Sequence, residues 1–163
     1  MADEIERKFL LKNDSWKQEV THSKSFRQGY IRTVAPPRVS VRVRIEGDEA
    51  FLTLKGPARG ITRSEYQYPV PLADAEDMLR DLVSCGEVEK IRHYVSAPPY
   101  TWEIDEYLGE NAGLVTAEIE LPAEDAVFDV PHWLGKEVTG IPRYYNSQLA
   151  KRPWRTWTPE EQA

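Results

Sequence analysis

Apolar and polar side chains alternate along most of this chain, and that pattern constrains its fold more than any other feature. A period of two is typical of a β-strand, because successive side chains point to opposite faces of a sheet. From Val39 to Glu46 one face carries only aliphatic side chains, while the other carries Ser40, Arg42, Arg44 and Glu46. The pattern predicts a chain dominated by strands, with charged residues on their second face.

Eight segments share this pattern and are predicted as strands: 4–11, 23–33, 38–47, 49–56, 61–70, 87–95, 100–108 and 114–121. The glycine and aspartate between the third and fourth predict a tight turn, so these two are expected to be antiparallel neighbours. One helix is predicted over 72–86, ending at Gly86. Shorter helical turns are expected over 14–19 and 144–151.

The 163 residues predict one domain with a buried core, which we place at 1–150. The tail 151–163 is basic, aromatic and broken by proline, and is expected to be unstructured or draped over the domain. Pro36 and Pro37 predict a stiff connection. Many short strands with few helices favour an antiparallel closed sheet. Periodicity alone does not decide whether the charges lie in water on a sandwich or inside a barrel.

Composition excludes several classes of protein. A formal net charge of -6 argues against general nucleic-acid binding, which needs a basic domain. Cys85 is the only cysteine, which excludes an internal disulfide and fits a reducing compartment. The acidic start lacks the features of a signal peptide, and the apolar runs are too short to span a membrane. We therefore expect a cytoplasmic protein without a membrane partner.

The charges on the second face are sorted by sign, strand by strand. Carboxylates two positions apart occur in three strands: Glu4 and Glu6, Glu103 and Asp105, Glu118 and Glu120. Cations stand at the same parity: Lys8, Arg42, Arg44, Lys55, Arg63, Lys90 and Arg92. A single such pair most often lies on the solvent-exposed face of a sheet. A solvent-exposed face does not require acids and bases to be separated strand by strand over the whole set. We interpret the set as two halves of one site.

Each half requires a partner of opposite charge. Carboxylates that converge need a cation, because like charges at close range raise each other's pKa. Hard oxygen ligands without cysteine or clustered histidine select Mg²⁺ or Mn²⁺ over zinc. The basic rows equally require a polyanion, and the arginine fork fits phosphate oxygens. A phosphate chain carrying a divalent metal satisfies both halves.

This ordered series resembles the signature of the CYTH family, the triphosphate tunnel metalloenzymes. It begins with Glu-x-Glu-x-Lys at Glu4, Glu6 and Lys8. The later motifs follow in order: Arg-x-Arg at Arg42 and Arg44, Thr-Leu-Lys ending at Lys55, Arg-x-Glu at Arg63 and Glu65, Lys-x-Arg at Lys90 and Arg92, Glu-x-Asp at Glu103 and Asp105, Glu-x-Glu at Glu118 and Glu120, and RYYNSQLA from Arg143. The resemblance covers nearly all of residues 3–150.

The resemblance implies an α+β fold: an eight-stranded antiparallel closed β-barrel with a few flanking helices, whose interior binds a triphosphate and two divalent ions. The implied metal ligands are Glu4, Glu6, Glu103, Asp105, Glu118 and Glu120. The implied phosphate-binding residues are Lys8, Arg42, Arg44, Lys55, Arg63, Lys90, Arg92 and Arg143. Three residues are expected to take part in catalysis: Lys8, Lys90, which orients the attacking water, and Glu65, which holds a second metal or orients the basic rows.

The chain departs from the family pattern in two places. Gln67 stands where compact members often carry a second acid after Arg-x-Glu, so an acceptor is kept but a charge is not. Tyr145 and Gln148 lie where some relatives carry lysines. The resemblance therefore leaves open how this end of the chain contributes to phosphate binding.

The resemblance implies hydrolysis of inorganic triphosphate to pyrophosphate and phosphate. In two-metal catalysis one ion bridges carboxylates and phosphate oxygens, and the other lowers the pKa of water from about 16 toward neutrality. Three alternatives stay open: a class IV adenylate cyclase making cyclic AMP, a thiamine or nucleoside triphosphatase, and a non-catalytic polyphosphate-binding module. A homodimer is expected only because dimers are the commonest soluble oligomers.

Overall fold

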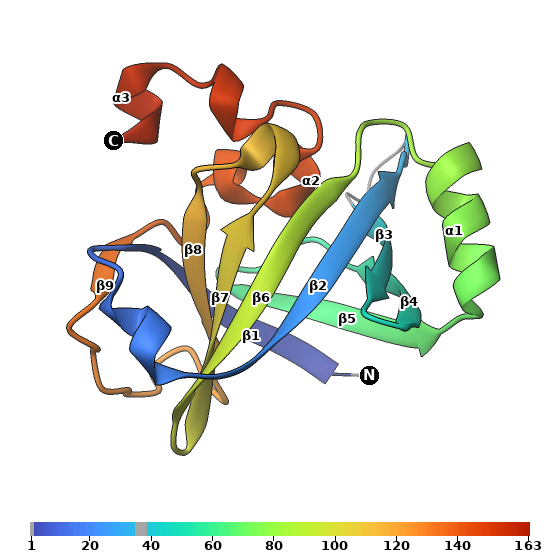
Figure 1. Ribbon diagram of the computed structural model, residues 1–163. Helices are drawn as coiled ribbons and strands as arrows, with labels where there is room; N and C mark the ends of the chain where they lie inside the picture. Colours follow the sequence, from blue (N-terminus) through green and yellow to red (C-terminus); the bar gives the residue numbers. More distant parts are fainter. Residues whose placement is uncertain (1, 35–38) are drawn as a thin grey trace.

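The computed structural model describes residues 2–34 and 39–163 (Figure 1). Its strands are β1 Ala2–Leu11, β2 Val20–Ile31, β3 Ser40–Glu46, β4 Glu49–Lys55, β5 Thr62–Pro69, β6 Val88–Ala97, β7 Tyr100–Tyr107, β8 Val115–Glu120 and β9 Leu134–Glu137. The helices are α1 Leu72–Asp81, α2 Asn146–Leu149 and α3 Pro159–Gln162, with 3-10 turns η1 Ser15–Glu19, η2 Gly109–Asn111, η3 Pro142–Tyr144 and η4 Trp154–Thr156. All the predicted strands are present. The short β9 was not predicted, because four residues are too few to show a period.

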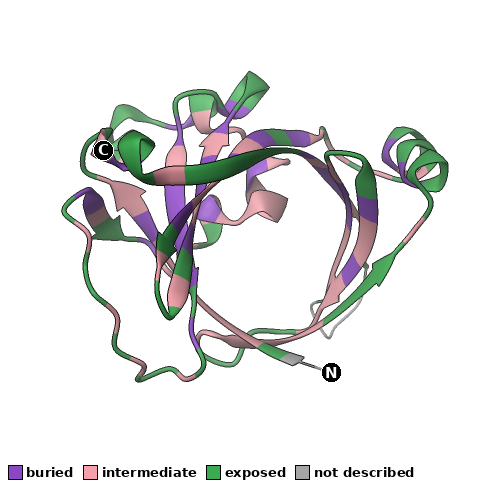
Figure 2. Ribbon diagram, turned by 60° about the horizontal axis from the view of Figure 1, so that its bottom comes forward, coloured by how far each residue is buried: buried purple, intermediate pink, exposed green. Residues whose placement is uncertain are grey.

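The strands form a closed antiparallel ring. Each strand pairs with its neighbours in the order β5-β4-β3-β2-β6-β7-β8-β1, and β1 also pairs with β5. The first half of β1, Ala2 to Ile5, pairs with β5, and its second half, Glu6 to Leu10, pairs with β8. Short β9 joins β1 beyond the end of β5. Figure 2 looks into the ring. The predicted closed barrel is therefore confirmed, and the sandwich alternative is wrong.

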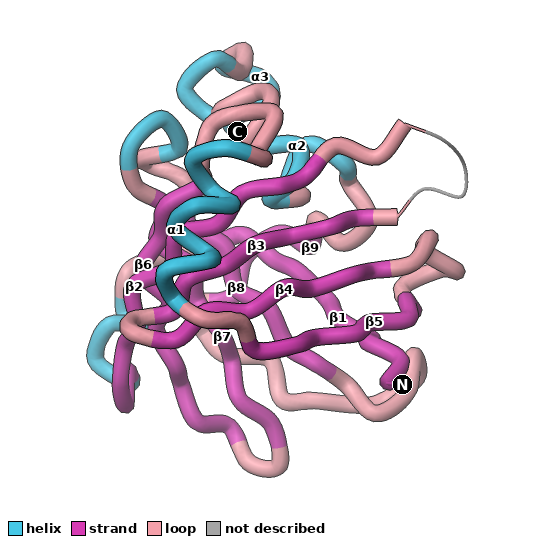
Figure 3. The backbone as a smooth tube through the Cα atoms, turned by 90° about the vertical axis from the view of Figure 1, so that its right-hand side faces the viewer, coloured by secondary structure: helices cyan, strands magenta, loops and turns pink. Residues whose placement is uncertain are grey.

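The apolar side chains of the strands pack on the outside of this ring. One cluster, with Trp102 and Ile119 at its centre, is covered by η1 and by the segment that leads to Trp133. A second cluster brings Tyr107 against the C-terminal residues Tyr144, Leu149 and Trp157. A third lies between α1 and the strands β3 and β4, and Figure 3 shows α1 on that outer side. Because the apolar faces are used outside, the charged faces line the interior.

The predicted helix and the predicted tail differ in part from the structure. The helix ends at Asp81 and not at Gly86, because Val83 instead forms a β-bridge with Ile31. The tail 151–163 contains η4 and α3, and Trp157 is only 5% exposed. It is draped over the domain, so the unstructured alternative is wrong. The short turns at 14–19 and 144–151 are present as η1 and as η3 with α2.

The stiff connection predicted at Pro36 and Pro37 lies outside the described residues. Within the described part of the chain, no helix combines the length and the apolar character that crossing a membrane requires.

Candidate active site inside the closed sheet

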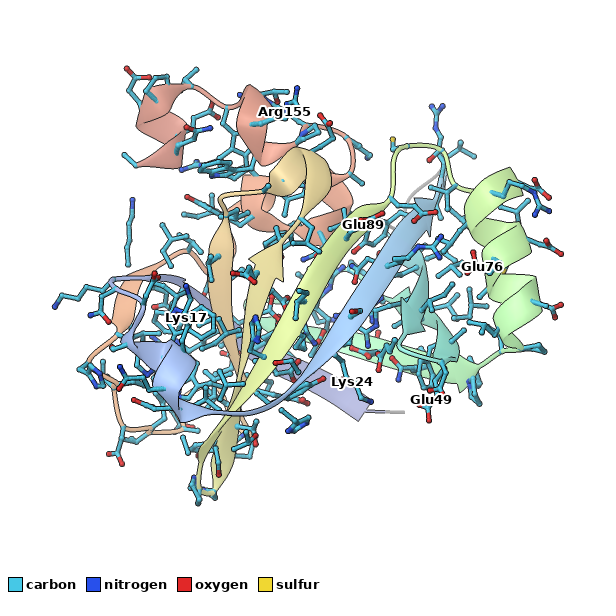
Figure 4. All side chains as sticks on the ribbon, viewed as in Figure 1. Lys17, Lys24, Glu49, Glu76, Glu89 and Arg155 are labelled. Atoms are coloured by element: carbon cyan, nitrogen blue, oxygen red, sulfur yellow. The ribbon has the colours of Figure 1, made fainter. Side chains whose placement is uncertain are left out.

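Strand register places the sorted charges on one face, directed into the ring. Glu6 is paired with Glu120, and Lys8 with Glu118. Glu118 also stands opposite Glu103 on its other side. Side chains of directly paired residues lie on the same face of a sheet, so these acids and Lys8 form adjacent rows. Figure 4 draws the side chains on the ribbon and labels Glu76 of α1 and Arg155 near the C-terminus, which both lie outside the ring.

Asp105 is the most deeply buried charge of the site. It is fully buried, and its Oδ2 accepts a hydrogen bond from Lys90 Nζ at 2.7 Å. Arg92 donates from Nε to Oδ1 at 2.7 Å and from Nη2 to Oδ2 at 2.8 Å, and also contacts Glu103. Burial alone raises the pKa of Asp105, but Arg92 and Lys90 outweigh it and hold the pKa below its usual value.

Burial and the neighbouring Arg92 lower the pKa of Lys90 to about 8, although Asp105 opposes the shift. This ammonium lies with its carboxylate partner in a site where almost no water reaches it, since Lys90 is 2% exposed. A lysine held in this way is a more readily deprotonated group than a surface lysine. Strongly perturbed pKa values of this kind are typical of catalytic sites.

Lys8 connects β1 to β8 and to the C-terminal segment. Its Nζ lies 2.9 Å from Glu118 Oε1 and donates to the carbonyl oxygen of Tyr144 at 3.2 Å. Burial lowers the pKa of Lys8, but the carboxylate of Glu118 and other nearby groups more than offset that effect and raise it. Glu118 also lies 3.7 Å from Arg92, and these cations hold its pKa well below normal against the effect of burial.

A second group of charges surrounds Lys55. Its Nζ donates to both carboxylate oxygens of Glu4, at 2.8 and 2.7 Å, and lies 3.4 Å from Glu65. Burial raises the pKa of Glu65, but Lys55 and Arg42 lower it further than burial raises it.

Glu6 and Glu120 differ from the other acids, because neither makes a hydrogen bond or ion pair with another residue in 2–34 or 39–163. Burial and the carboxylates of Glu118 and Glu4 raise the pKa of Glu6 well above normal. Burial, Glu4 and Glu65 also raise the pKa of Glu120. Both carboxylates therefore lie in an environment that favours an added cation.

The arginines of β3 complete the basic side. Arg44 forms an ion pair with Glu46, and burial, Arg42 and Arg92 lower its pKa to about 10. Arg42 donates to Thr53 Oγ1 at 3.3 Å, and that hydroxyl donates to Gln67 Oε1 at 3.2 Å. Gln67 thus serves as a neutral acceptor. Glu46 was not predicted as part of the site, although it shares the parity of Arg44.

Arg63 and Arg143 stand apart from the other predicted cations. Arg63 lies opposite Glu4 in the register and donates from Nε to the carbonyl oxygen of Gly56 at 3.1 Å. The guanidinium of Arg143 lies over the rings of Tyr144 and Trp157, 4.9 and 5.5 Å from their centroids. Neither arginine forms an ion pair with a carboxylate of the described residues.

Sequence analysis missed the polar residues that link these charges to the C-terminal segment. Asn146 Oδ1 accepts hydrogen bonds from Lys90 Nζ at 3.1 Å and from Gln28 Nε2 at 3.3 Å. Asn146 Nδ2 donates to the hydroxyl of Tyr107 at 3.1 Å. The one sequence signal for these residues was the alternation of side chains along β2, which places the polar Gln28 on the interior face. Asn146 belongs to the motif RYYNSQLA, but the motif did not indicate that α2 directs this side chain toward the ring.

The carboxylates fit a divalent cation by chemistry but are not assembled into a ready metal site. Among the described residues, no group of three or more His, Cys, Asp and Glu side chains lies close enough to hold a metal. The reason is that Glu4, Glu103, Asp105 and Glu118 are engaged with lysine and arginine. Their hard oxygens, and the raised pKa values of Glu6 and Glu120, still match Mg²⁺ or Mn²⁺.

Two surface pockets lie away from this interior. One of about 280 Å³ lies beside α1 at Asp77 and Met78, and one of about 290 Å³ lies between Leu11 and Trp154. Neither is lined by an interior charge. The interior is the part of the described molecule where acids and bases are gathered in opposing rows.

Comparison with known proteins connects this geometry to a family. The model of the CYTH domain matches residues 2–148. An inorganic triphosphatase of Acetivibrio thermocellus is 46% identical over 157 residues, which are 96% of this chain and 99% of that relative. The crystal structure of the inorganic triphosphatase NE1496 is 36% identical with a TM-score of 0.65, covering 92% of this chain and 95% of that one. The PH1012 protein of Pyrococcus horikoshii, 20% identical with a TM-score of 0.58 over 75% of this chain and 80% of that one, shares the fold.

Proposed function

This chain belongs to the CYTH domain family, and from that premise we propose that it hydrolyses inorganic triphosphate to pyrophosphate and phosphate with a divalent metal ion. The observation that carries the proposal is the pairing of two opposed rows of charge inside one closed sheet. The carboxylates provide hard ligands for a cation, and the lysines and arginines provide ligands for a phosphate chain. The inorganic triphosphatase that is 46% identical supports the same reaction.

The metal is proposed to be Mg²⁺ or Mn²⁺, with two ions bound. The residues that would hold them are Glu4, Glu6, Glu103, Asp105, Glu118 and Glu120. When bound, such ions supply charge stabilisation to phosphoryl oxygens and a water molecule of lowered pKa. Glu65, ion-paired with Lys55, would support a second ion or orient the basic row.

The cations are proposed to bind the phosphate oxygens. They are Lys8, Arg42, Arg44, Lys55, Arg63, Lys90, Arg92 and Arg143. In the structure Lys8, Arg44, Lys55, Lys90 and Arg92 are held by carboxylates, so binding exchanges one anionic partner for another. Each of these five cations therefore keeps an anionic partner throughout, which avoids the desolvation cost of an unpaired ion.

The chemistry then depends on positioning and on neutralisation of developing charge, with no protein nucleophile. Lys90 is proposed to orient the attacking water, because it is buried beside Asp105 and has a lowered pKa. Lys8 is proposed to stabilise charge on the phosphate, from its place between Glu118 and the Tyr144 carbonyl.

The test is phosphate release from inorganic triphosphate, ATP and thiamine triphosphate, with Mg²⁺, with Mn²⁺ and with EDTA, alongside an assay for cyclic AMP. We expect metal-dependent turnover of inorganic triphosphate that a Glu4→Gln, Glu6→Gln double variant loses by at least about 100-fold. Glu110→Gln is the matched control, because this glutamate pairs with Arg155 on the surface, where both side chains are more than 60% exposed.

The other outcomes contradict the proposal in distinct ways. Cyclic AMP as the main product would make the protein a cyclase. Preference for thiamine triphosphate or ATP would move it to another triphosphatase class. Tight triphosphate binding without turnover would leave a binding module.

The setting of the reaction is also proposed. A cytoplasmic location is supported by the single cysteine, and a partner set without nucleic acid by the net charge of -6. A homodimer stays a prediction. The division into a domain at 1–150 and a tail at 151–163 is supported by the family match, which ends at residue 148.

A further inference from the structure

We propose that Asn146 is a positioning residue for this reaction, which holds the ammonium group of Lys90 in its working place. The inference rests on the proposed hydrolysis of triphosphate. Asn146 belongs to α2, far along the chain from Lys90 on β6, and their side chains meet only through the fold.

Lys90 Nζ is held from two sides. Asp105 Oδ2 accepts at 2.7 Å and Asn146 Oδ1 at 3.1 Å. The rings of Phe26 and Tyr107 also lie near it, with centroids 5.7 and 5.6 Å from Nζ. A lysine ammonium has three donors, so these two acceptors leave one for a phosphate oxygen or a water molecule. Asp105 alone would leave the ammonium free to turn, and Asn146 determines where the remaining donor points.

The amide of Asn146 is itself oriented by its neighbours. Lys90 Nζ and Gln28 Nε2 are both donors, so the oxygen of the amide must face them. The amide nitrogen then faces the hydroxyl of Tyr107. Gln28 Nε2 also donates to the hydroxyl of Tyr30 at 2.8 Å, which holds the glutamine in turn. A flipped amide would place its NH₂ against two donors, so one orientation is strongly preferred.

The backbone that carries Asn146 is firmly attached to the barrel. Tyr144 and Leu149, on either side of it, are buried in the second apolar cluster. Lys8 donates to the carbonyl oxygen of Tyr144. A side chain needed only for packing would not require three directed hydrogen bonds to β2, β6 and β7. The arrangement is that of a residue that supports a reacting group through precise placement.

The experiment compares Asn146→Ala with Ser147→Ala, its neighbour on α2, for which the structure shows no side-chain hydrogen bond within the described residues. With inorganic triphosphate and Mg²⁺, Asn146→Ala is expected to lower kcat by about 10- to 100-fold, because misplacement of a reacting group costs rate. Its KM is expected to change by less than about 3-fold, since the other cations still bind the phosphates. Ser147→Ala should match the wild type in both parameters.

A double-variant cycle separates positioning from general support of the fold. In a Lys90→Ala background, Asn146→Ala is expected to lower kcat by less than about 2-fold more, because residues that act through one another are not additive. Asn146→Asp keeps an acceptor opposite Lys90 and is expected to retain kcat within about 5-fold of the wild type. Far-UV circular dichroism and thermal unfolding check each variant, and Asn146→Ser replaces Asn146→Ala in the cycle if the alanine variant does not fold.

Two results would overturn the inference while leaving the proposed function intact. One is a wild-type kcat in Asn146→Ala. The other is an equal loss with and without Lys90, which is the result that a purely structural role predicts. A wild-type protein that hydrolyses triphosphate with neither Mg²⁺ nor Mn²⁺ overturns the proposed function and this inference together.

Discussion

At the scale of single residues, the buried ion pairs of the site depend on their oppositely charged partners for stability. Asp105 is fully buried between Lys90 and Arg92, and its carboxylate stabilises the charge of each of these two cations, which repel each other. Desolvating one carboxylate or one ammonium costs several kcal/mol, on the order of what its partners return. Parity along the strands predicted which residues share this face. It did not predict that Asp105 serves two cations, while Glu6 and Glu120 carry raised pKa values.

This coupling predicts a large effect on stability from a single substitution. Asp105→Ala is expected to lower the free energy of unfolding by about 3–5 kcal/mol, because Lys90 and Arg92 are left buried without their carboxylate. Urea denaturation measures the change, and Glu110→Gln on the surface should cost less than about 1 kcal/mol. Equal values for the two variants would mean that the buried ions are hydrated in solution.

At the scale of elements, the tail 151–163 is structured and packs against the domain. The backbone N–H of Trp154 donates a hydrogen bond to Asn111 Oδ1 at 2.8 Å. Its ring lies against Gly113, where an added Cβ would come within 2.5 Å of Trp154 Cζ3. Trp157 packs edge-on against Tyr144, with ring centroids 5.1 Å apart. A sequence broken by proline predicted no regular structure here, because the contacts that order it come from η2 and from the barrel.

Two glycines of one loop test this docking. Gly113 has a φ of +106° and faces Trp154, whereas Gly109 has a φ of +60° and nothing within 4 Å of an added Cβ. Each change to alanine should cost about 1–2 kcal/mol for the left-handed backbone. Gly113→Ala should cost about 1–3 kcal/mol more, because its methyl group overlaps the indole.

The measurement is thermal or urea unfolding of both variants, with tryptophan fluorescence as the local signal. A change in fluorescence is expected for Gly113→Ala alone. If the two substitutions have the same effect on stability, the C-terminal segment is not docked on this loop in solution.

At the scale of the whole molecule, closure of the ring brings the charged faces of the strands together into one site. The pairing of β1 with both β5 and β8 brings Glu4 and Glu6 within reach of Lys55 and Glu118. The ion pairs inside the ring join the acidic and basic groups. Under the proposed function, a metal ion bound to the acids would release lysines and arginines for phosphate, and a phosphate chain bound to the bases would release carboxylates for metal.

The two ligands are accordingly expected to bind with positive coupling. Inorganic triphosphate and Mg²⁺ together should raise the melting temperature by more than the sum of the shifts that each gives alone, because each ligand frees binding groups for the other. For scale, a ligand that binds the folded state stabilises it by about 2.7 kcal/mol at 100 times its Kd. Ca²⁺, which also binds hard oxygen ligands, replaces Mg²⁺ in this measurement where hydrolysis of triphosphate must be slowed. The coupling would be contradicted if the two shifts in melting temperature only add, and if the Glu4→Gln, Glu6→Gln variant gives the same shifts as the wild type.

The sequence alone determined the local features of this protein. Side-chain alternation is a property of neighbouring residues, so it located eight strands and the parity of every predicted site residue on them, and the order of the motifs indicated the family. Tertiary structure decided what depends on distant partners. Closure through β1 and β5 turned the charged faces inward, β9 added a strand too short to carry a pattern, and α2 brought Asn146 to Lys90. The physical reason is that a period of two specifies which face a residue occupies, whereas the register between strands and the docking of helices specify what that face meets.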